Sequence, residues 1–335
     1  MASDKINWGK PPSDNISLDE CEWYHAMEIP GIGGDNITPS VSFDCREDIG
    51  NILGNLDYNG KKVLNLGSIT GYLSFEAERR GGDVTSIDLS VDQSQMAKQQ
   101  ATERDWVPRA NEDWKQDLKA FMDREVLRRN AFWFAHKALN SKSRMLISHA
   151  NNLPKELETH DIGIIFSVLL HIRDPFLALQ RMCSHVNEKI VITELGGYPT
   201  YLFKLIPSST YIKYKDFIAR LKKDNKTLID KLPNFIGKRF RNPPAMNFLP
   251  QYGRSASKWW SFKPETIIAM LKVLGFGKTT VNYHYYKHVK GKKQWNFTVV
   301  GERTIPIENV IMIMTLIKKI HHIQKVLCFR MRKSL

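Results

Sequence analysis

From residue 62 onward, short apolar runs alternate with longer segments whose apolar residues recur at helical spacing. The apolar runs at 63–67, 83–88, 144–150, 162–170 and 189–195 are typical of strands buried on both faces of a parallel sheet. Helical patterns at 72–81, 131–141 and 174–186 separate them. The pattern predicts five parallel strands joined by helical crossovers.

The later part of the chain changes to an antiparallel pattern. Residues 263–277 predict a helix, with Pro264 in its first turn and Gly275 at its end. The runs 279–288 and 294–303 flank the turn VKGKK and predict a hairpin. We therefore expect an α/β, Rossmann-like sheet of seven mostly parallel strands, closed by an antiparallel C-terminal hairpin.

Composition along the chain divides it into segments. Residues 1–60 are rich in Pro, Gly, Asn and Asp and predict an N-terminal lid, followed by the α/β domain at 61–305. Between Ser90 and Ser143 there is more chain than one crossover requires, so 105–125 is expected to be an added excursion. We expect a basic helical insertion at 197–256 and a basic amphipathic helix at 306–335.

A glycine turn follows the first strand and opens the first helix. It reads Gly67-Ser68-Ile69-Thr70-Gly71, and Asp88 ends the next strand. Such a turn directs backbone N–H groups at a nucleotide-like ligand, and an acid at this position accepts ribose hydroxyls. A β-branched residue at the middle position disfavours the close approach of a pyrophosphate, so Ile69 argues against NAD or FAD. The alternative is a tight structural turn without a cofactor.

The overall composition indicates the class of protein and its cellular compartment. The apolar fraction of 42% and charged fraction of 25% are ordinary for a globular protein. The four cysteines have neither disulfide-framework nor zinc spacing, so no metal site is expected, and a reducing compartment is indicated. There is no run of signal-peptide or membrane-span character. These features predict a cytoplasmic protein without a transmembrane segment.

The positive charge is concentrated rather than spread. The net charge is +14, residues 201–255 carry basic side chains against only Asp216, Asp224 and Asp230, and no acid follows Glu308. A basic surface with interleaved aromatic residues can bind RNA, and the apolar stripe of the tail could lie on an anionic membrane. A solvated amphipathic segment and a docking helix are the plainer alternatives.

Six stretches together resemble class I S-adenosylmethionine-dependent methyltransferases. Within this class they are similar to a branch of carboxymethyl-type enzymes that act on tRNA. Those enzymes complete 5-oxyacetic acid uridine at the wobble position. The six stretches are 23–46, 61–90, 131–142, 164–182, 191–195 and 259–277. The resemblance implies S-adenosylmethionine as cofactor. It implies that Gly67, Ser68 and Gly71 line its methionine end, that Asp88 holds the ribose, that Ala150 and Asn151 flank the adenine, and that Phe166 and Leu170 form the floor beneath it.

The sequence also departs from this family pattern. Asn65 stands where most members have aspartate, so its contact to the cofactor amine would be a neutral hydrogen bond. The wobble-uridine enzymes grip a carboxylated cofactor with a lysine and a tryptophan, but here the stretch 38–46 has no lysine and Cys45 aligns with the tryptophan. Ordinary S-adenosylmethionine is the expected cofactor.

Methyl transfer needs alignment of acceptor, methyl and sulfur, and needs a base only if the acceptor loses a proton. The candidate catalytic residues are His171 after the fourth strand, His25 in the lid and Glu194 at the end of the fifth strand. Each has a structural alternative: His171 could fix its turn, His25 could pack in an aromatic cluster, and Glu194 could accept from nearby backbone N–H groups.

Three further side chains are candidates for substrate contact. Tyr24 adjoins His25, Arg46 could clamp a carboxylate, and Trp260 could stack on a planar acceptor. A surface ion pair at Arg46 and apolar burial at Trp260 are the alternatives. The predicted function is a methyltransferase acting on a small metabolite or glycan-type hydroxyl, the alternatives being a tRNA-modifying enzyme and a degenerate scaffold that binds RNA or membrane.

Overall fold

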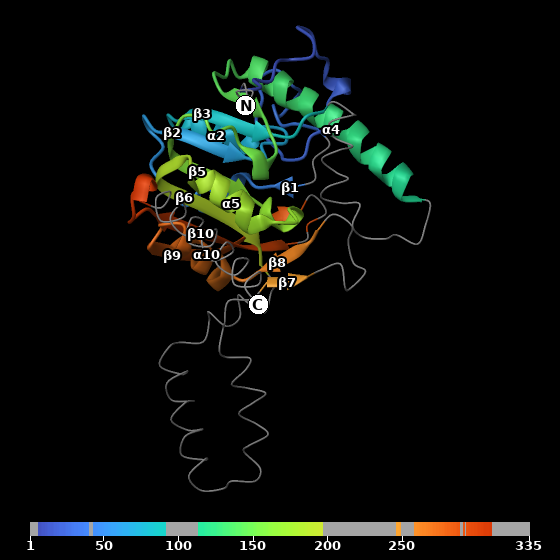
Figure 1. Cartoon of the computed structure of the whole chain (residues 1–335). Coiled ribbons are helices and arrows are strands. Elements are labelled where there is room, and N and C mark those ends of the chain that lie inside the picture. The colour runs from blue at the N-terminus through green and yellow to red at the C-terminus, as the bar shows by residue number, and fades with distance from the viewer. Residues whose placement is uncertain are drawn as a thin grey trace, which may run out of the picture.

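The computed structural model describes residues 6–39, 43–91, 113–196, 246–248, 258–288, 291 and 293–309. Its centre is an eight-stranded sheet in the order β1-β9-β10-β6-β5-β2-β3-β4 (Figure 1). The parallel strands are β2 (Lys62–Leu66), β3 (Asp83–Asp88), β4 (Arg144–Ile147), β5 (His160–Phe166) and β6 (Val186–Leu195).

The chain enters this sheet at its middle. It starts at β2, steps outward through β3 to β4, returns to β5 on the other side of β2, and continues outward to β6. The strand order therefore reverses between β2 and β5. In open α/β sheets, ligands bind at the carboxyl ends of the strands beside such a reversal. The fold thus directs attention to the segments that follow Leu66, Asp88 and Phe166.

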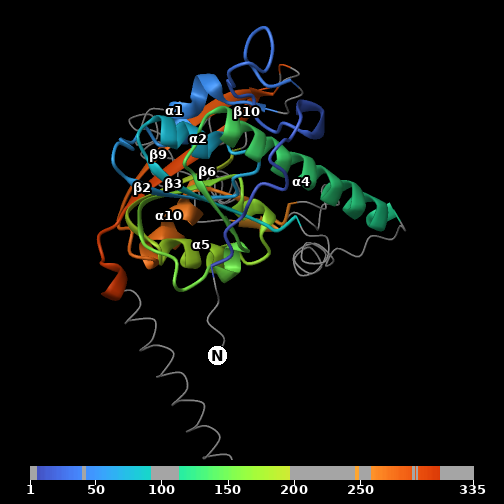
Figure 2. The ribbon, with the colours of Figure 1, turned by 90° about the horizontal axis from the view of Figure 1, so that it is seen from above.

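Helices cover both faces of the sheet (Figure 2). Helices α2 (Tyr72–Arg79) and α4 (Asp113–Ala138) lie on one face, and α5 (Pro175–Cys183) and α10 (Pro264–Val273) lie on the other. Alternate residues of each strand serve the two faces. In β2, Val63 packs with the α2 side while Leu64 packs with the α5 side. Both faces are consequently apolar, as the continuous apolar runs predict.

An antiparallel pair closes the sheet. Strand β10 (Lys293–Glu302) pairs with β6, and β9 (Lys278–His288) pairs with β10. This confirms the Rossmann-like α/β class and the hairpin. The predicted seven strands are joined by a short eighth one, β1 (Phe43–Asp44), which adds to the outer edge of β9. A separate ribbon pairs β7 (Met246–Phe248) with β8 (Trp260–Phe262).

Three predicted boundaries were wrong. The strand expected at 162–170 ends at Phe166, because Ser167 takes a left-handed φ of 52° and the 3₁₀ turn η4 (Leu169–His171) follows. The strand expected at 144–150 ends at Ile147, before the 3₁₀ turn η3 (Ala150–Asn152). The helix expected at 131–141 is the last part of α4, which already begins at Asp113.

The N-terminal segment is attached to the domain at several points. It includes the 3₁₀ turns η1 (Leu18–Glu20) and η2 (Arg46–Asp48) and the short helix α1 (Ile49–Ile52). Trp23 and Ile29 are buried with the α2 side of the core. Apart from β7, the insertion predicted at 197–256 lies outside the described residues, as does the predicted tail helix beyond 309. Within the described ranges, no helix has the length and apolarity to cross a membrane.

Candidate functional site

The glycine turn connects β2 to α2 at the reversal of strand order. Gly67 and Gly71 have φ of 81° and 88°, and Ile69 also has a left-handed φ of 51°. A Cβ atom at Gly67 would clash with the Val168 side chain, and one at Gly71 would clash with the Phe75 ring. Glycine is thus needed at both positions for backbone conformation and for close packing.

Most N–H donors of this turn are engaged within the protein. The N–H groups of Gly67 and Ser68 donate to the carbonyl of Ile87, at 2.9 and 3.2 Å, and Gly71 donates to the carbonyl of Ser68 at 2.7 Å. The N–H of Ile69 donates to Asp88 Oδ2 at 2.6 Å. A pyrophosphate-binding turn must keep such donors for its ligand. The observed pattern therefore does not suit a dinucleotide, as predicted from Ile69.

Asp88 ties the end of β3 to the turn. Its Oδ2 accepts from the Ile69 N–H and, at 3.2 Å, from the Ser68 hydroxyl, while Oδ1 accepts from the Leu89 N–H at 2.7 Å. The guanidinium of Arg129, from α4, lies 3.6 Å from Oδ1 and donates to the Leu89 carbonyl. These contacts fix the orientation of the carboxylate. Its place beside the turn is the one predicted for a ribose acceptor.

Asn65 is completely buried beneath α2. Its amide donates to the Ser74 hydroxyl at 2.8 Å, and Ser74 in turn accepts from Ser86, which lies 3.1 Å from the Ser143 hydroxyl. This chain of hydroxyls joins β2, α2, β3 and β4. Asn65 therefore holds the start of α2 on the sheet, and the predicted contact to a cofactor amine depends on its unpaired Oδ1.

Five buried polar atoms without a hydrogen-bond partner lie near the carboxyl ends of the parallel strands, among the described residues. Such atoms are rare in folded proteins and call for a ligand, a water or a functional role. Among the described residues they include Asn65 Oδ1 and Thr70 Oγ1 at the turn, Asn151 Oδ1 after β4, Ser167 Oγ after β5 and Glu194 Oε2 at the end of β6. Others lie elsewhere, among them both ring nitrogens of His160 at the amino end of β5, but the five at the carboxyl ends of the strands fit a bound polar ligand.

The segment after β4 adjoins Asp88. The N–H of Ser148 donates to the Asp88 carbonyl at 2.9 Å, and the His149 ring accepts from the Asn151 N–H at 3.2 Å. Ala150 is buried in the core, and Asn151 is half-buried. The two residues predicted to flank an adenine therefore follow a strand that is paired directly with the strand of Asp88.

Glu194 is fully buried at the end of β6. Its Oε1 accepts from the Leu169 N–H at 3.0 Å, which anchors η4, while Oε2 has no partner. Burial raises the pKa of Glu194 to about 8, and hydrogen bonds from Leu169 and Leu170 and the charge of Lys258 oppose this only in part. The group is consequently a neutral acid at pH 7. Glu194 is compatible with both predicted roles. Its Oε1 accepts the hydrogen bond that anchors η4, as the structural role requires, and its Oε2 has no partner and could contact a ligand.

His25 lies in a cluster of aromatic rings on the face of the sheet that α2 covers. Its ring stacks on Phe166 at a centroid distance of 5.8 Å and lies 5.7 Å from Tyr72 and 4.8 Å from Tyr24. Burial, aided by the charge of Arg128, lowers the pKa of His25 to about 3, so the ring is neutral at physiological pH. Its Nδ1 has no hydrogen-bond partner. A proton acceptor with so low a pKa is a weak base.

His171 and Trp260 lie together on the α5 side. His171 belongs to η4, and its N–H donates to the Val168 carbonyl at 2.9 Å. Trp260 donates its indole N–H to the carbonyl of Arg173 at 3.1 Å and packs partly against the core. The N–H of Trp259 meets the Leu170 carbonyl. The structure thus brings His171, Leu170 and Trp260 together. The hydrogen bond from the Trp260 indole N–H to the Arg173 carbonyl fixes the orientation of this side chain.

Arg46 does not present the unpaired cation that a carboxylate clamp requires. Its guanidinium makes a bidentate pair with Asp44, at 3.0 and 2.9 Å, and lies 3.6 Å from Glu28. The hydrogen bond from Arg46 holds the pKa of Asp44 below its ordinary value. Of the two alternatives at this position, the geometry matches the ion pair.

Three residues with functional positions escaped the sequence analysis. Ser167 combines a left-handed φ with an unpaired hydroxyl at the end of β5, a conformation that is uncommon for a non-glycine residue. Tyr72 follows Gly71 directly, and Tyr286 on β9 lies 6.0 Å from the Phe166 ring. Only Tyr72 carried a sequence signal, its adjacency to the turn. No cluster of metal-ligating residues occurs within the described part of the chain.

Comparisons with known proteins give similarities of fold only. No protein-family model and no curated protein matches the sequence. The magnesium protoporphyrin IX methyltransferase of Synechocystis, solved with S-adenosylhomocysteine, is 12% identical with a TM-score of 0.39, covering 77% of this chain and 81% of that one. The 1,6-didemethyltoxoflavin-N1-methyltransferase of Burkholderia thailandensis is 10% identical with a TM-score of 0.40, covering 78% of each chain.

A third solved structure is an S-adenosylmethionine-dependent methyltransferase of Methanosarcina mazei. It is 14% identical with a TM-score of 0.38, and the alignment covers 76% of this chain and 97% of that one. At these TM-scores the similarities establish no activity. The strand order and the geometry of the turn, Asp88 and Glu194 remain the basis for a functional conclusion.

Proposed function

We propose that the protein is an S-adenosylmethionine-dependent methyltransferase acting on a small-molecule acceptor, with a hydroxyl as the favoured acceptor group. The observation that carries the proposal is the glycine turn at the strand-order reversal. Its N–H donors are bound internally, so the turn suits a nucleoside without phosphates, and Asp88 stands beside it. The unpaired polar atoms at the same edge supply further ligand contacts.

The residues present fit this cofactor. Gly67 and Ser68 would face its methionine end, Asp88 its ribose hydroxyls, and Asn151 its adenine. When bound, S-adenosylmethionine supplies an electrophilic methyl group on a sulfonium sulfur. The protein contributes alignment and exclusion of water, for which the rings around His25 and Phe166 provide an apolar enclosure.

Two buried groups, Glu194 and His25, can form hydrogen bonds with a methyl acceptor. Glu194 is protonated at neutral pH and can donate a hydrogen bond from Oε2, whereas the neutral ring of His25 can accept one at Nδ1. Neither group carries a charge at pH 7. A neutral acceptor such as a hydroxyl therefore suits this environment better than an anionic one, since the lid cation Arg46 is already paired with Asp44.

Calorimetry with S-adenosylhomocysteine tests the cofactor assignment. We expect micromolar binding by the full chain, weakened at least tenfold by Asp88→Ala because the ribose loses its acceptor. Asp83→Ala is the matched control, since Asp83 is exposed at the amino end of the same strand. No heat at millimolar ligand would remove the enzyme assignment in favour of a binding scaffold.

The acceptor class is tested separately. A gel shift with tRNA over a salt series reports on the basic segment 201–255, of which only β7 lies within the described part of the chain. We expect no complex at 150 mM salt for an enzyme with a small-molecule acceptor. Tight binding that weakens steeply with salt would instead favour the tRNA substrate.

A further inference from the structure

Helix α4 carries two adjacent arginines whose side chains are largely buried. Arg129 is 6% exposed, and the side chain of Arg128 is 15% exposed. Consecutive residues of an α-helix point about 100° apart around its axis. The two guanidinium groups therefore contact different parts of the molecule. Arg129 reaches the carboxyl end of β3, and Arg128 reaches the N-terminal segment.

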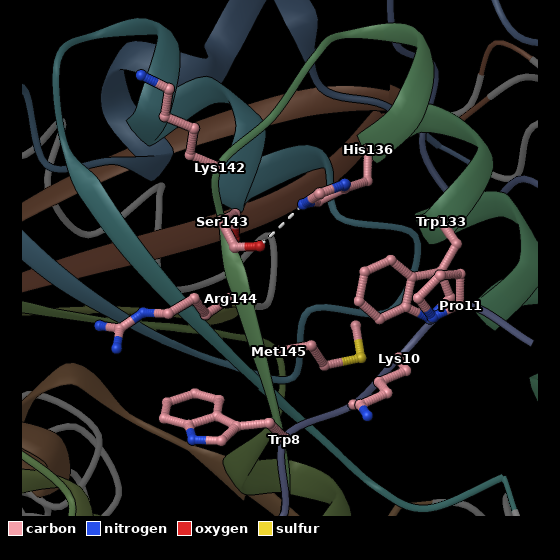
Figure 3. Close-up of a pocket in the computed structure, with 10 residues that line it drawn as sticks. Trp8, Lys10, Pro11, Trp133, His136, Lys142, Ser143, Arg144 and Met145 are labelled. Atoms are coloured by element: carbon pink, nitrogen blue, oxygen red, sulfur yellow. Dashed lines mark hydrogen bonds between the residues drawn. The ribbon is translucent and has the colours of Figure 1, made fainter. Parts of the chain in front are cut away.

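The last part of α4, which carries both arginines, packs against β4. Trp133 and His136 of the helix and Met145 of the strand line a cavity together with the N-terminal segment (Figure 3). The His136 Nε2 lies 2.9 Å from the Ser143 carbonyl, the contact drawn as a dashed line in Figure 3. The guanidinium of Arg129 contacts Met145 Sδ. These contacts hold the helix on β4, the neighbour of β3, and so place Arg129 beside the end of β3.

Arg129 holds the residue pair at the end of β3. Its Nη2 donates to the Leu89 carbonyl at 2.9 Å and lies 3.6 Å from Asp88 Oδ1. A carboxylate has about four acceptor positions. At Asp88, Oδ2 accepts from two donors of the glycine turn, and Oδ1 accepts from the Leu89 N–H. The remaining position is thus on Oδ1, beside Arg129, and a rotated carboxylate would no longer offer it to a ribose hydroxyl.

Arg128 docks the N-terminal segment on α4. It donates to Glu22 Oε1 from Nε at 3.1 Å and from Nη2 at 2.8 Å, and its Nη1 donates to Glu125 Oε1 at 2.7 Å. Its guanidinium also lies over the Tyr24 ring, 5.1 Å from the centroid. The N–H of Glu22 donates to the Leu127 carbonyl at 3.2 Å. Both the backbone and the side chains of this segment are therefore fixed at α4.

The docked segment leads directly to His25. The His25 ring lies 4.8 Å from the Tyr24 ring and stacks on Phe166, which ends β5. Burial lowers the pKa of His25 to about 3, and the positive charge of Arg128 contributes to this shift. Arg128 thus affects His25 in two ways, because it holds the preceding residues and keeps the ring neutral.

We propose that both arginines are positioning residues for methyl transfer, Arg129 acting through Asp88 on the cofactor and Arg128 acting through the Tyr24–His25 segment on the acceptor. This inference rests on the proposed function, in which Asp88 contacts the ribose and His25 can accept a hydrogen bond from the acceptor. Because each arginine acts through a different neighbour, loss of one should impair one half of the site and spare the other.

Calorimetry of the full chain with S-adenosylhomocysteine tests Arg129. We expect Arg129→Gln to weaken binding about tenfold and Arg129→Lys, which keeps the charge, about threefold. Arg128→Gln removes the same charge from the adjacent position and should leave the affinity unchanged, as should Arg124→Gln on the exposed side of α4. Urea unfolding of each variant confirms that it is folded under the conditions of the titration.

A double-mutant cycle separates positioning from a merely structural role. If Arg129 acts through Asp88, then Arg129→Gln should weaken binding by less than about twofold when Asp88→Ala is already present. A structural role predicts the same loss in both backgrounds, and that result would contradict the proposed action of Arg129.

Nuclear magnetic resonance titration of the His25 ring tests Arg128. We expect Arg128→Gln to raise the pKa of His25 from about 3 toward the ordinary value of 6.5, because the ring loses a neighbouring positive charge and the segment loses its anchor. Arg128→Lys should retain most of the low pKa, and Arg129→Gln is the matched control. His25→Gln assigns the resonance.

The outcomes distinguish this inference from the function on which it rests. Absence of binding by the unaltered protein at millimolar S-adenosylhomocysteine overturns the proposed function and the inference together. Unchanged affinity of Arg129→Gln, or an unchanged pKa of His25 in Arg128→Gln, overturns the inference and leaves the proposed function standing.

Discussion

The buried carboxyl of Glu194 makes the stability of the protein depend on pH in a direction opposite to that of most acids. In an unfolded chain this group ionises near its ordinary pKa of 4.5, whereas in the folded protein burial raises its pKa to about 8. Between these two values the folded state keeps a proton that the unfolded state has lost. The free energy of unfolding therefore falls as pH rises from about 4.5 to about 8 and then levels off.

The size of this effect follows from the two pKa values. One pKa unit corresponds to about 1.4 kcal/mol, so the full difference between 4.5 and about 8 amounts to roughly 5 kcal/mol, of which roughly 4 kcal/mol develops between pH 5 and pH 9. Glu194→Gln removes the titration and keeps the shape of the side chain, including an oxygen that can accept from the Leu169 N–H. We expect the variant to gain stability over the unaltered protein by roughly 4 kcal/mol between pH 5 and pH 9.

Urea unfolding at pH 5, 7 and 9 measures the difference directly. The comparison must be between variants, because the buried His25 and His160 have lowered pKa values and destabilise the fold at acid pH. Glu188→Gln is the control, since Glu188 lies on the same strand but pairs with Lys61 at the surface. Parallel pH profiles for Glu194→Gln and the unaltered protein would show that Glu194 is ionised in the folded state and would refute the reasoning.

Three further substitutions have defined outcomes. Gly67→Ala should cost about 1 to 3 kcal/mol in urea unfolding, because its φ is left-handed and its Cβ would clash with Val168. His284→Ala should cost about 2 to 4 kcal/mol in the same assay, since it leaves the buried carboxylate of Asp48 without its ring partner. Because the pKa of His25 is about 3 in the folded protein and 6.5 in an unfolded chain, its burial lowers the free energy of unfolding as pH falls from 6.5 to 3. His25→Gln should remove this loss. We expect the drop in melting temperature from pH 7 to pH 4 to be smaller in the variant than in the unaltered protein.

Local patterns were sufficient for the parallel part of the sheet. Apolar runs of strand length and glycine turns are properties of neighbouring residues, so β2, α2 and β3 could be placed from the sequence. The antiparallel hairpin was also found, because its turn lies between two apolar runs. Asp88 was predicted to lie beside the glycine turn because of its distance along the chain from that turn. In the structure its carboxylate accepts a hydrogen bond from the turn.

Contacts between distant segments could not be read in the same way. The chain Asp48–His284–Thr298–Thr193 joins η2, β9, β10 and β6, and none of its members has a local signal. The left-handed conformation of Ser167 ends β5 early because Glu194 accepts from the N–H of Leu169 two residues later. The pairing of Arg46 with Asp44 is local, but it depends on side-chain orientation, which spacing alone does not specify.

The internal bonds of Asp88 explain how isoleucine is tolerated in the glycine turn. A left-handed φ at a β-branched residue costs on the order of 1 to 3 kcal/mol. At Ile69 a short hydrogen bond from its own N–H to Asp88 Oδ2 offsets this cost, and hydrogen bonds to carboxylates are among the stronger ones. Asp88 therefore shapes the turn before any ligand arrives. Asp88→Asn should consequently destabilise the turn as well as weaken nucleoside binding, whereas a residue that served the ligand alone would leave the free energy of unfolding unchanged.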